Sequence, residues 1–234
     1  MPIIDLLYPK HCPVCLDALP PGDRLICAPC RQKIRYVKEP ACYKCGKPLA
    51  DETKEFCGSC AQKMPPFIRG VAYAEYGSKY IRRMLSEVKY HQDPQLLDFP
   101  CLDFAGRYRP MFERWNAEAL IPVPVHRSRL KARGYNQAAE IARRMSDVLD
   151  IPVDETYLLR TGRTEAQKKL NDVERFMNLL NAFSVDGEPG RYRTVILVDD
   201  IYTTGSTLSA CTKVLQNAGV PAVYTAVLAI GRDR

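Results

Sequence analysis

The chain has 234 residues, of which 46% are hydrophobic and 26% are charged. This length suits one ordinary domain with a small accessory region, since most domains run to about 100–200 residues. No apolar stretch approaches the ~20 residues that a transmembrane helix needs, so we expect no membrane insertion. The opening residues, MPIIDLLYPKHC, lack the charged leader, long apolar centre and cleavage site of a secretory signal, which predicts a cytoplasmic protein.

Eight of the ten cysteines form four CxxC pairs that recur every 15 residues near the start of the chain. Regular pairs of this kind are typical of metal sites, and disulfides are rare in a reducing cytosol. We therefore expect two structural Zn²⁺ sites, each closed by four thiolates and without an open position for catalysis. The expected ligands are Cys12, Cys15, Cys27 and Cys30 in one site, and Cys42, Cys45, Cys57 and Cys60 in the other. A cross-braced pairing of the first and third pairs, His11 as a ligand, and redox-active pairs are the alternatives.

The formal net charge of +7 would favour a polyanionic partner if it stood alone. A zinc ion held by four thiolates carries a net −2, because the thiols lose their protons on binding. Two such sites lower the formal charge to about +3. Only a local basic patch can therefore indicate a nucleic-acid partner.

Met64-Pro65-Pro66 marks the expected boundary between two domains, because consecutive prolines disfavour a helix and extend the chain. Residues 1–65 would be a double zinc ribbon of two units, each with too little core to fold without its metal. Residues 66–234 would form the larger domain.

Strands and helices alternate beyond this boundary. We expect strands at residues 70–76, 119–125, 194–198 and 222–229, and helices after Ser78, at residues 136–149 and at residues 206–218. Pro94 and Pro100 are expected to interrupt a helical region that runs to residue 112, and the charged residues 158–183 are expected to form a long lid-like loop. Alternation of this kind predicts an α/β fold with a parallel sheet flanked by helices, whose ligands gather at the carboxyl ends of strands.

Residues 195–207, VILVDDIYTTGST, place Asp199 and Asp200 at the end of an apolar strand. Thr203, Thr204, Gly205, Ser206 and Thr207 follow and lead into a helix. Free amides at a helix N-terminus, hydroxyls and a glycine together form an anion site, although the lysine of a Walker A loop is absent. Helix capping accounts for one of the two acids but not for both. The pattern suits a ligand that carries a phosphate and sugar hydroxyls, with Mg²⁺ nearby.

VILVDDIYTTGST resembles the fingerprint of type I phosphoribosyltransferases, which bind phosphoribosyl pyrophosphate (PRPP). Residues 121–137 (IPVPVHRSRLKARGYNQ), residues 160–183 (RTGRTEAQKKLNDVERFMNLLNAF) and the cysteine pairs resemble the ComF/GntX-like subgroup, so the resemblance spans nearly the whole chain. It implies a type I phosphoribosyltransferase-like sheet behind a double zinc ribbon, and PRPP bound with Mg²⁺. It further implies that Asp199 and Asp200 bind the ribose hydroxyls and that residues 203–207 surround the 5′-phosphate.

Basic residues in the same strings complete the site that the resemblance implies. Arg133, Lys168 and Arg175 are the candidates for neutralising the pyrophosphate that leaves, the last two on a loop that closes over PRPP, and Lys169 is an alternative on the same loop. A solvated basic surface is the alternative for each of them, and Asn136 also fits an ordinary helix N-cap. Lys89 matches a lysine of the subgroup.

The resemblance leads to two main hypotheses about function. Members of this family are linked to DNA uptake in natural transformation, so the first is a phosphoribosyltransferase that works beside proteins of the uptake machinery. Its acceptor is unidentified, because no nucleobase-recognising motif is present. The second is a non-catalytic protein that binds single-stranded nucleic acid through Arg127, Arg129, Lys131 and Arg133, with PRPP as a regulator. A pure scaffold, needing zinc but not Asp199, is a third.

Overall fold

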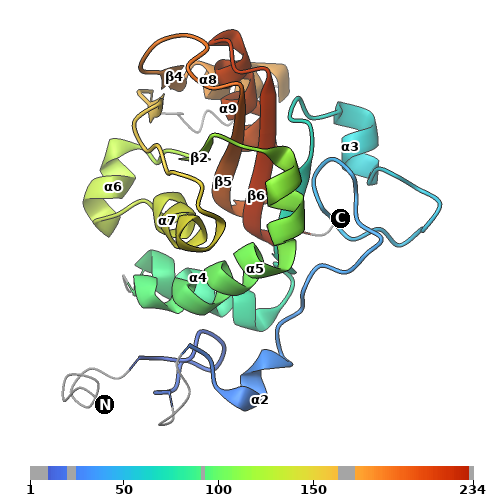
Figure 1. The fold of residues 1–234 in the computed structure, drawn as a ribbon, viewed down its shortest axis with the longest axis vertical. Helices are drawn as coiled ribbons and strands as arrows, with labels where there is room; N and C mark the ends of the chain where they lie inside the picture. Colours follow the sequence, from blue (N-terminus) through green and yellow to red (C-terminus); the bar gives the residue numbers. More distant parts are fainter. Residues whose placement is uncertain (1–9, 20–24, 91–92, 163–171, 232–234) are drawn as a thin grey trace.

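A four-stranded parallel sheet, in the order β1-β6-β5-β2, forms the centre of the molecule (Figure 1). The computed structural model describes residues 10–19, 25–90, 93–162 and 172–231. The strands are β1 (Gly70–Glu75), β2 (Ala119–Pro122), β5 (Thr194–Tyr202) and β6 (Ala222–Ile230). A separate antiparallel pair consists of β3 (Leu158–Arg160) and β4 (Phe183–Val185). Parallel pairing of β1 with β6, β6 with β5 and β5 with β2 confirms the predicted sheet.

Helices cover both faces of this sheet (Figure 1). One face carries α4 (Lys79–Tyr90), the 3-10 helix η1 (Pro94–Leu97), α5 (Asp98–Trp115) and α7 (Gln137–Leu149). The other face carries α8 (Asp172–Leu180) and α9 (Ser206–Asn217). Three short helices lie outside these layers: α2 (Ala28–Arg31), α3 (Gly58–Lys63) and α6 (Arg127–Arg133).

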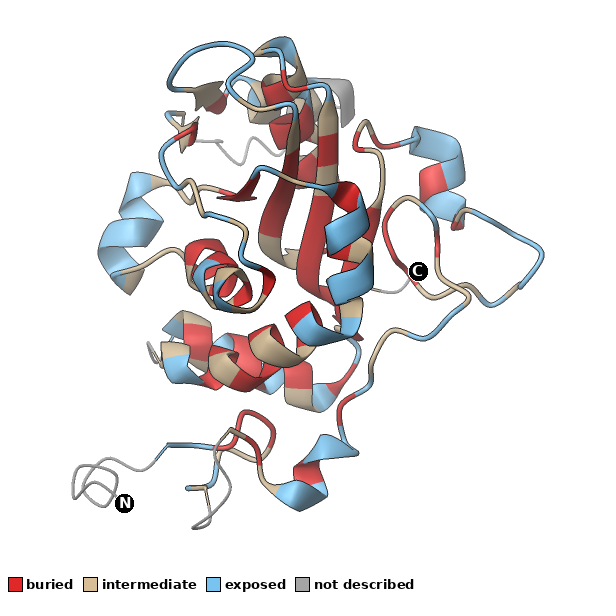
Figure 2. Cartoon of the chain, viewed as in Figure 1, coloured by how far each residue is buried: buried red, intermediate tan, exposed pale blue. Residues whose placement is uncertain are grey.

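Burial on both faces explains the continuous apolar run of β5. Val195 and Leu197 join the core on the α9 side, whereas Ile196 and Val198 join the core on the α7 side. Successive side chains of a strand point to opposite faces, so a strand covered on both sides needs apolar residues at every position. Figure 2 shows this as strands that are buried along most of their length.

The two cysteine-containing units lie in different places on this core. The first unit contributes Cys12, Val14 and Ile26 to the core shared with α4, α5 and α7. The second contributes its four cysteines to the core on the α9 side, where they are grouped with Phe67. In Figure 1 the first unit accordingly lies below α4 and α5, and the second lies beside the sheet near α3. The domain boundary after residue 65 stays a prediction.

Short segments cover both edges of the sheet. Residues 35–37 run antiparallel to β1, with the Val37 amide donating to the Tyr73 carbonyl at 3.1 Å and the Glu75 amide donating to the Arg35 carbonyl at 2.9 Å. Residues 152–154 bond to Leu120 of β2 on the opposite side. Strand edges that are covered in this way offer no open ladder for another chain.

Three elements differ from the expectations from sequence. Pro100 lies in the first turn of α5 and does not interrupt it, because an amide in the first turn has no partner within the helix to lose. The basic residues 127–133, for which no helix was predicted, form a helix capped by His126 and Gly134. Strand β5 continues past Val198 to Tyr202, since β6 pairs with it over that length.

The predicted helix after Ser78 is present. Ile81, Met84, Leu85 and Val88 are buried on α4, as their helical spacing predicts. The expectation of a long loop at residues 158–183 was wrong for its described parts, because they contain β3 and α8 and reach the start of β4. Residues 163–171 of this segment lie outside the described part of the chain. Within the described ranges, none of the helices has the length and apolar character needed to cross a bilayer.

Candidate functional site

Asp199 and Asp200 lie on β5, which β2 and β6 flank in the middle of the sheet. Both residues are partly buried, and the Asp200 amide donates to the Asp199 carboxylate at 2.9 Å. Adjacent carboxylates repel each other, and their surroundings on this strand leave little water to screen the repulsion. The pair is therefore held at an energetic cost that folding alone does not explain.

The pKa of Asp199 shows how unfavourable the charged form of this carboxyl group is in the folded protein. Burial, and next the charge of Asp200, raise the pKa of Asp199 from 3.8 to about 8. A carboxyl group with this pKa is mainly protonated at neutral pH and ionises when a cation or a hydrogen-bond donor arrives. Perturbed groups of this kind concentrate at functional sites, because a ligand can offset the unfavourable charge.

Asp200 is held by a lysine from another element. The Lys89 ammonium group, in the last turn of α4, lies 2.6 Å from an Asp200 carboxylate oxygen. The two side chains are 21% and 16% exposed, so water and salt screen the attraction between them less than in a surface pair. Sequence analysis singled out Lys89 only by resemblance, and the structure places it in direct contact with the acidic pair.

Residues 203–207, which we call the phosphate loop, connect β5 to α9. Thr203, Thr204 and Ser206 are exposed, and the hydroxyls of Thr204 and Ser206 lie 2.9 Å apart. Gly205 is the N-cap of α9 with φ +75° and has no side chain to cap the helix, while the Ser206 amide donates to the Thr204 hydroxyl at 3.4 Å. The positive end of the helix dipole is therefore open to an anion beside the two carboxylates. All residues predicted to bind phosphate and ribose thus lie on one continuous segment.

The residues predicted to bind pyrophosphate do not lie on one continuous segment, unlike those predicted to bind ribose and phosphate. Arg133 lies at the end of α6, where its guanidinium donates to the Gln137 side-chain oxygen at 3.0 Å. Lys168 lies outside the described residues, as do Thr164, Gln167 and Leu170 of the same string. Arg175 falls within α8, but its side chain is outside the described part. A contact between these cations and a ligand stays a prediction.

Arg160 is a residue of this region that sequence analysis did not single out. It ends β3, and its guanidinium lies over the Phe183 ring, 5.2 Å from the centroid. Burial, and next the charge of Arg129, lower the pKa of Arg160, while the neighbouring Asp199 acts in the opposite direction. Arg160 also lines a cleft of about 530 Å³ between α6, the start of α7 and β3. The only signal in the sequence was its position at the start of the string that resembles the subgroup.

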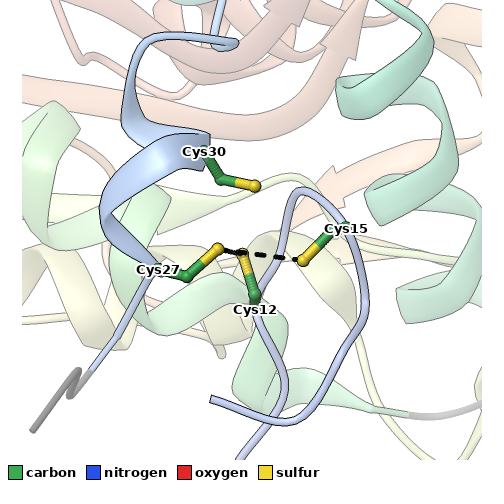
Figure 3. A group of neighbouring side chains, drawn as sticks. All are labelled: Cys12, Cys15, Cys27 and Cys30. Carbon is green, nitrogen blue, oxygen red and sulfur yellow. Dashed lines mark hydrogen bonds between the residues drawn. The ribbon is translucent and has the colours of Figure 1, made fainter. Parts of the chain in front are cut away.

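The cysteines form two groups of four with the membership that the spacing predicts. We call Cys12, Cys15, Cys27 and Cys30 the first cluster and Cys42, Cys45, Cys57 and Cys60 the second cluster. Within each cluster the sulfur atoms all lie within 4.8 Å of one another. Figure 3 shows the first cluster, in which the loop with Cys12 and Cys15 faces the turn that bears Cys27 and Cys30.

The sulfur positions fit zinc. Zn–S bonds of about 2.3 Å in a tetrahedron place the sulfur atoms roughly 3.8 Å apart. The separations are 3.5 Å for Cys12–Cys27, 3.8 Å for Cys15–Cys27 and 3.7 Å for Cys45–Cys57. Four sulfur ligands close the coordination sphere, so the ions would be structural. Burial acts to raise the pKa of Cys12, but nearby backbone amides, led by those of Cys15 and Cys27, lower it to about 7. Burial raises the pKa of Cys15 and of Cys27 to about 11, so the metal-free cluster does not favour four thiolates at once.

Comparison with known proteins agrees with this arrangement. A double zinc ribbon domain model matches residues 3–70, and a phosphoribosyl transferase domain model matches residues 132–234. Competence protein F of Haemophilus influenzae is 34% identical over 200 residues, covering 83% of this chain and 86% of that protein. The DNA utilization protein YhgH of Escherichia coli K12 is 30% identical over 221 residues, covering 93% and 96%.

A third relative extends the comparison to a more distant bacterium. Competence protein ComFC of Bacillus subtilis is 26% identical over 202 residues, covering 84% of this chain and 80% of that protein. In each case the match includes most of both chains. The chain therefore belongs to the ComF-like phosphoribosyltransferase family, which combines a double zinc ribbon with a phosphoribosyltransferase domain.

Proposed function

We propose that this protein binds PRPP with Mg²⁺ at the carboxyl end of β5 and takes part in DNA uptake from the cytoplasmic side. The observation that carries the proposal is the acidic pair beside the uncapped N-terminus of α9. Few ligands need a phosphate site next to a pair of carboxylates. A phosphorylated ribose is one of them, because it carries both a phosphate and sugar hydroxyls. The link to DNA uptake is supported by the printed names of the relatives, competence protein and DNA utilization protein.

Each part of the site has a role in this proposal. The amides and hydroxyls of the phosphate loop hold the 5′-phosphate, as helix N-termini generally hold anions. Asp199 and Asp200 accept hydrogen bonds from the ribose hydroxyls. These bonds take the place of the hydrogen bonds to water that the two carboxylates lose through their partial burial on the strand. Lys89 holds the Asp200 side chain in place before the ligand arrives. Mg²⁺, when bound with PRPP, would reduce the negative charge of the pyrophosphate.

Transfer of the phosphoribosyl group is the reaction that this arrangement would support. An acceptor nucleophile attacks C1 of the ribose, the bond from C1 to the pyrophosphate oxygen breaks, and pyrophosphate leaves with the electron pair. The side chains contribute by positioning the ribose and by neutralising the leaving group rather than by covalent chemistry. Arg133, Lys168 and Arg175 are proposed for that neutralisation.

Calorimetric titration with PRPP and Mg²⁺ tests the binding site. We expect the double variant Asp199→Ala/Asp200→Ala to weaken binding about tenfold or more, since hydrogen bonds to charged groups contribute roughly 1.5–3 kcal/mol each. The matched control is Asp51→Ala/Glu52→Ala, which removes another adjacent acidic pair from the exposed surface of the second unit. Equal affinity for PRPP in the two double variants would contradict the proposal.

A second function, binding of single-stranded nucleic acid, is favoured by α6. The helix carries Arg127, Arg129, Lys131 and Arg133, no acidic residue and no buried residue. Figure 2 shows it as exposed along most of its length. An exposed helix with charge of one sign suits a phosphate backbone, whose binding releases counterions.

The salt dependence of oligonucleotide binding tests this second function. Each phosphate contact to a single strand adds about 0.7 to the slope of log affinity against log salt concentration. We expect Arg127→Gln/Arg129→Gln to lower the slope by about 1.4. The control Arg191→Gln/Arg193→Gln removes two exposed arginines elsewhere and should leave the slope unchanged. A salt-independent affinity in the wild type would exclude this function.

A further inference from the structure

Tyr135 lies between α6 and α7, and its side chain reaches the helix that carries Lys89. Its hydroxyl donates to the Val88 carbonyl in the last turn of α4, 47 positions away in the chain. Carbonyls of the last four residues of an α-helix lack a partner within the helix, so a donor from another element fixes such a turn. Lys89, the next residue along α4, forms the ion pair with Asp200. Tyr135 therefore holds the turn from which that ammonium group extends.

The Tyr135 side chain is suited to a fixed contact of this kind. Its ring is half-buried and packs against the core that α4, α5 and α7 share. Burial, and next the charges of Glu140 and Asp93, raise the pKa of Tyr135, so the phenol keeps its proton and stays a donor at neutral pH. A tyrosine side chain has few rotatable bonds, so little conformational freedom is lost when its hydroxyl is held in place.

The backbone next to Tyr135 is tied to the strand that bears the acidic pair. The Asn136 side chain donates to the Val123 carbonyl at 3.1 Å, just beyond the end of β2. The Val123 amide in turn donates to the Val198 carbonyl at 2.9 Å, and Val198 immediately precedes Asp199 on β5. Two hydrogen bonds thus connect the turn before α7 to the strand at the point where the acidic pair begins.

These contacts form a closed ring that includes the acidic pair. From Asp200 the ring passes through Lys89 and Val88 of α4 to the Tyr135 hydroxyl, then through the turn before α7 to β2 and back to β5. A long lysine side chain loses conformational freedom when it is held in one position, and that loss weakens an ion pair. Fixing the turn from which Lys89 extends reduces the movement that the ion pair has to oppose.

We propose that Tyr135 is a positioning residue for PRPP binding, because it fixes the last turn of α4 and thereby the place of Lys89 against Asp200. The inference rests on the proposed function for the identity of the ligand, whereas the contact between Tyr135 and α4 is present without a ligand. Without the hydroxyl, Lys89 should leave Asp200 more often. Part of the binding free energy of PRPP would then be used to order the acidic pair, so the affinity would fall.

The first experiment measures the contact of Lys89 with Asp200 in the protein without PRPP. A water-soluble acetylating reagent modifies free amines, and peptide mass spectrometry gives the rate at each lysine. Tyr135→Phe, which keeps the ring but removes the hydroxyl, should be acetylated at Lys89 about threefold faster or more, as expected for loss of one hydrogen bond. Asp200→Asn, which removes the partner of the ammonium group, should also react faster. Lys54, paired with Asp51 on the exposed surface, is the internal reference and should react at one rate throughout.

The matched control is Tyr108→Phe, which removes a hydroxyl with a similar role elsewhere on the same face of the sheet. The Tyr108 hydroxyl donates to the Ala72 carbonyl of β1 at 3.1 Å, and its ring packs against the same core as that of Tyr135. This variant should show the wild-type rate at Lys89 and the wild-type affinity for PRPP. Equal rates at Lys89 in the two tyrosine variants would overturn the proposal.

The second experiment measures PRPP affinity in a double-mutant cycle with Lys89→Met. Tyr135→Phe alone should weaken PRPP binding about threefold or more, since one hydrogen bond is lost. If the tyrosine acts through the lysine, Tyr135→Phe should have no further effect in a chain that already carries Lys89→Met. A merely structural loss would be independent of the lysine, and independent effects on free energy add. Additive losses of affinity would therefore overturn the proposal.

The two experiments separate this inference from the proposed function. If the wild type does not bind PRPP, the proposed function fails, while faster acetylation of Lys89 in Tyr135→Phe, but not in Tyr108→Phe, still supports the positioning of Lys89 by Tyr135. If PRPP binds and Tyr135→Phe retains the wild-type affinity, the proposed function stands and the positioning role is overturned.

Discussion

At the scale of single residues, the acidic pair shows how a ligand site opposes stability. Asp199 is ionised in an unfolded chain above a pH of about 4, whereas burial and Asp200 raise its pKa to about 8 in the folded chain. Between these values the folded state binds more protons than the unfolded state. Its stability therefore falls as the pH rises through this range, because the carboxyl group must either take up a proton or carry an unfavourable charge.

We expect Asp199→Asn to unfold at higher urea concentration than the wild type, with a difference that grows from pH 6 to pH 8. The amide has no charge to bury, so the variant lacks the pH dependence, which is at most about 1.4 kcal/mol per pH unit. Urea unfolding of both proteins at pH 6 and pH 8 measures this difference in stability. Asp200→Asn serves as the comparison, since it also removes the partner of Lys89 and should gain less. A difference that does not change with pH would contradict the raised pKa.

At the scale of elements, Asn136 at the start of α7 has a structural role, although it lies in a string that resembles the ComF/GntX-like subgroup. The Asn136 side-chain oxygen accepts from the Ala138 amide, and its side-chain nitrogen donates to the Val123 carbonyl at 3.1 Å. The first bond caps α7, and the second ties the helix to the chain that follows β2. Both roles are structural, which agrees with the N-cap interpretation of the sequence.

Asn136→Ala should therefore destabilise the protein by about 1–2 kcal/mol, the usual cost of losing an N-cap. Asn136→Asp keeps an acceptor for the Ala138 amide but loses the donor to Val123, so it should cost less than the alanine variant. Thermal unfolding of the three proteins distinguishes the two bonds. Full stability of Asn136→Ala would assign this residue to ligand binding instead.

The parallel sheet flanked by helices was predictable from the sequence, because β5 is a continuous apolar run and α4 carries a helical pattern of apolar residues. Helix α6 was not predictable, since its charged residues show no apolar face and only the caps at His126 and Gly134 define it. The acidic pair and the phosphate loop are contiguous and could be identified from their order. The contact of Lys89 with Asp200 joins residues more than 100 positions apart, and no local pattern encodes such a contact.

At the scale of the whole molecule, the two clusters extend the cores on opposite faces of one sheet. We expect folding of each face to depend on metal binding at its own cluster, because a cluster without zinc would bring together four neighbouring thiols that repel when ionised. Both clusters are part of the hydrophobic cores of the molecule, since their cysteines pack against residues beyond residue 65.

We expect purified protein to contain about two zinc ions per chain, measured by elemental analysis. Cys57→Ser should retain about one zinc ion and melt at a lower temperature, because it opens the second cluster. The control is Cys101→Ser, a buried cysteine outside both clusters, which should retain both ions. A zinc content unaffected by Cys57→Ser would contradict the four-thiolate site.

The segment along the edge of β1 connects metal content to solubility. It lies between Cys30 of the first cluster and Cys42 of the second, so zinc bound at both clusters would fasten the chain on both sides of residues 35–37. Loss of metal would release this strip and bare the amide and carbonyl groups of β1 to any strand in solution. Zinc starvation would then be harmful through aggregation, with chains joining edge to edge, before it impaired any single binding event.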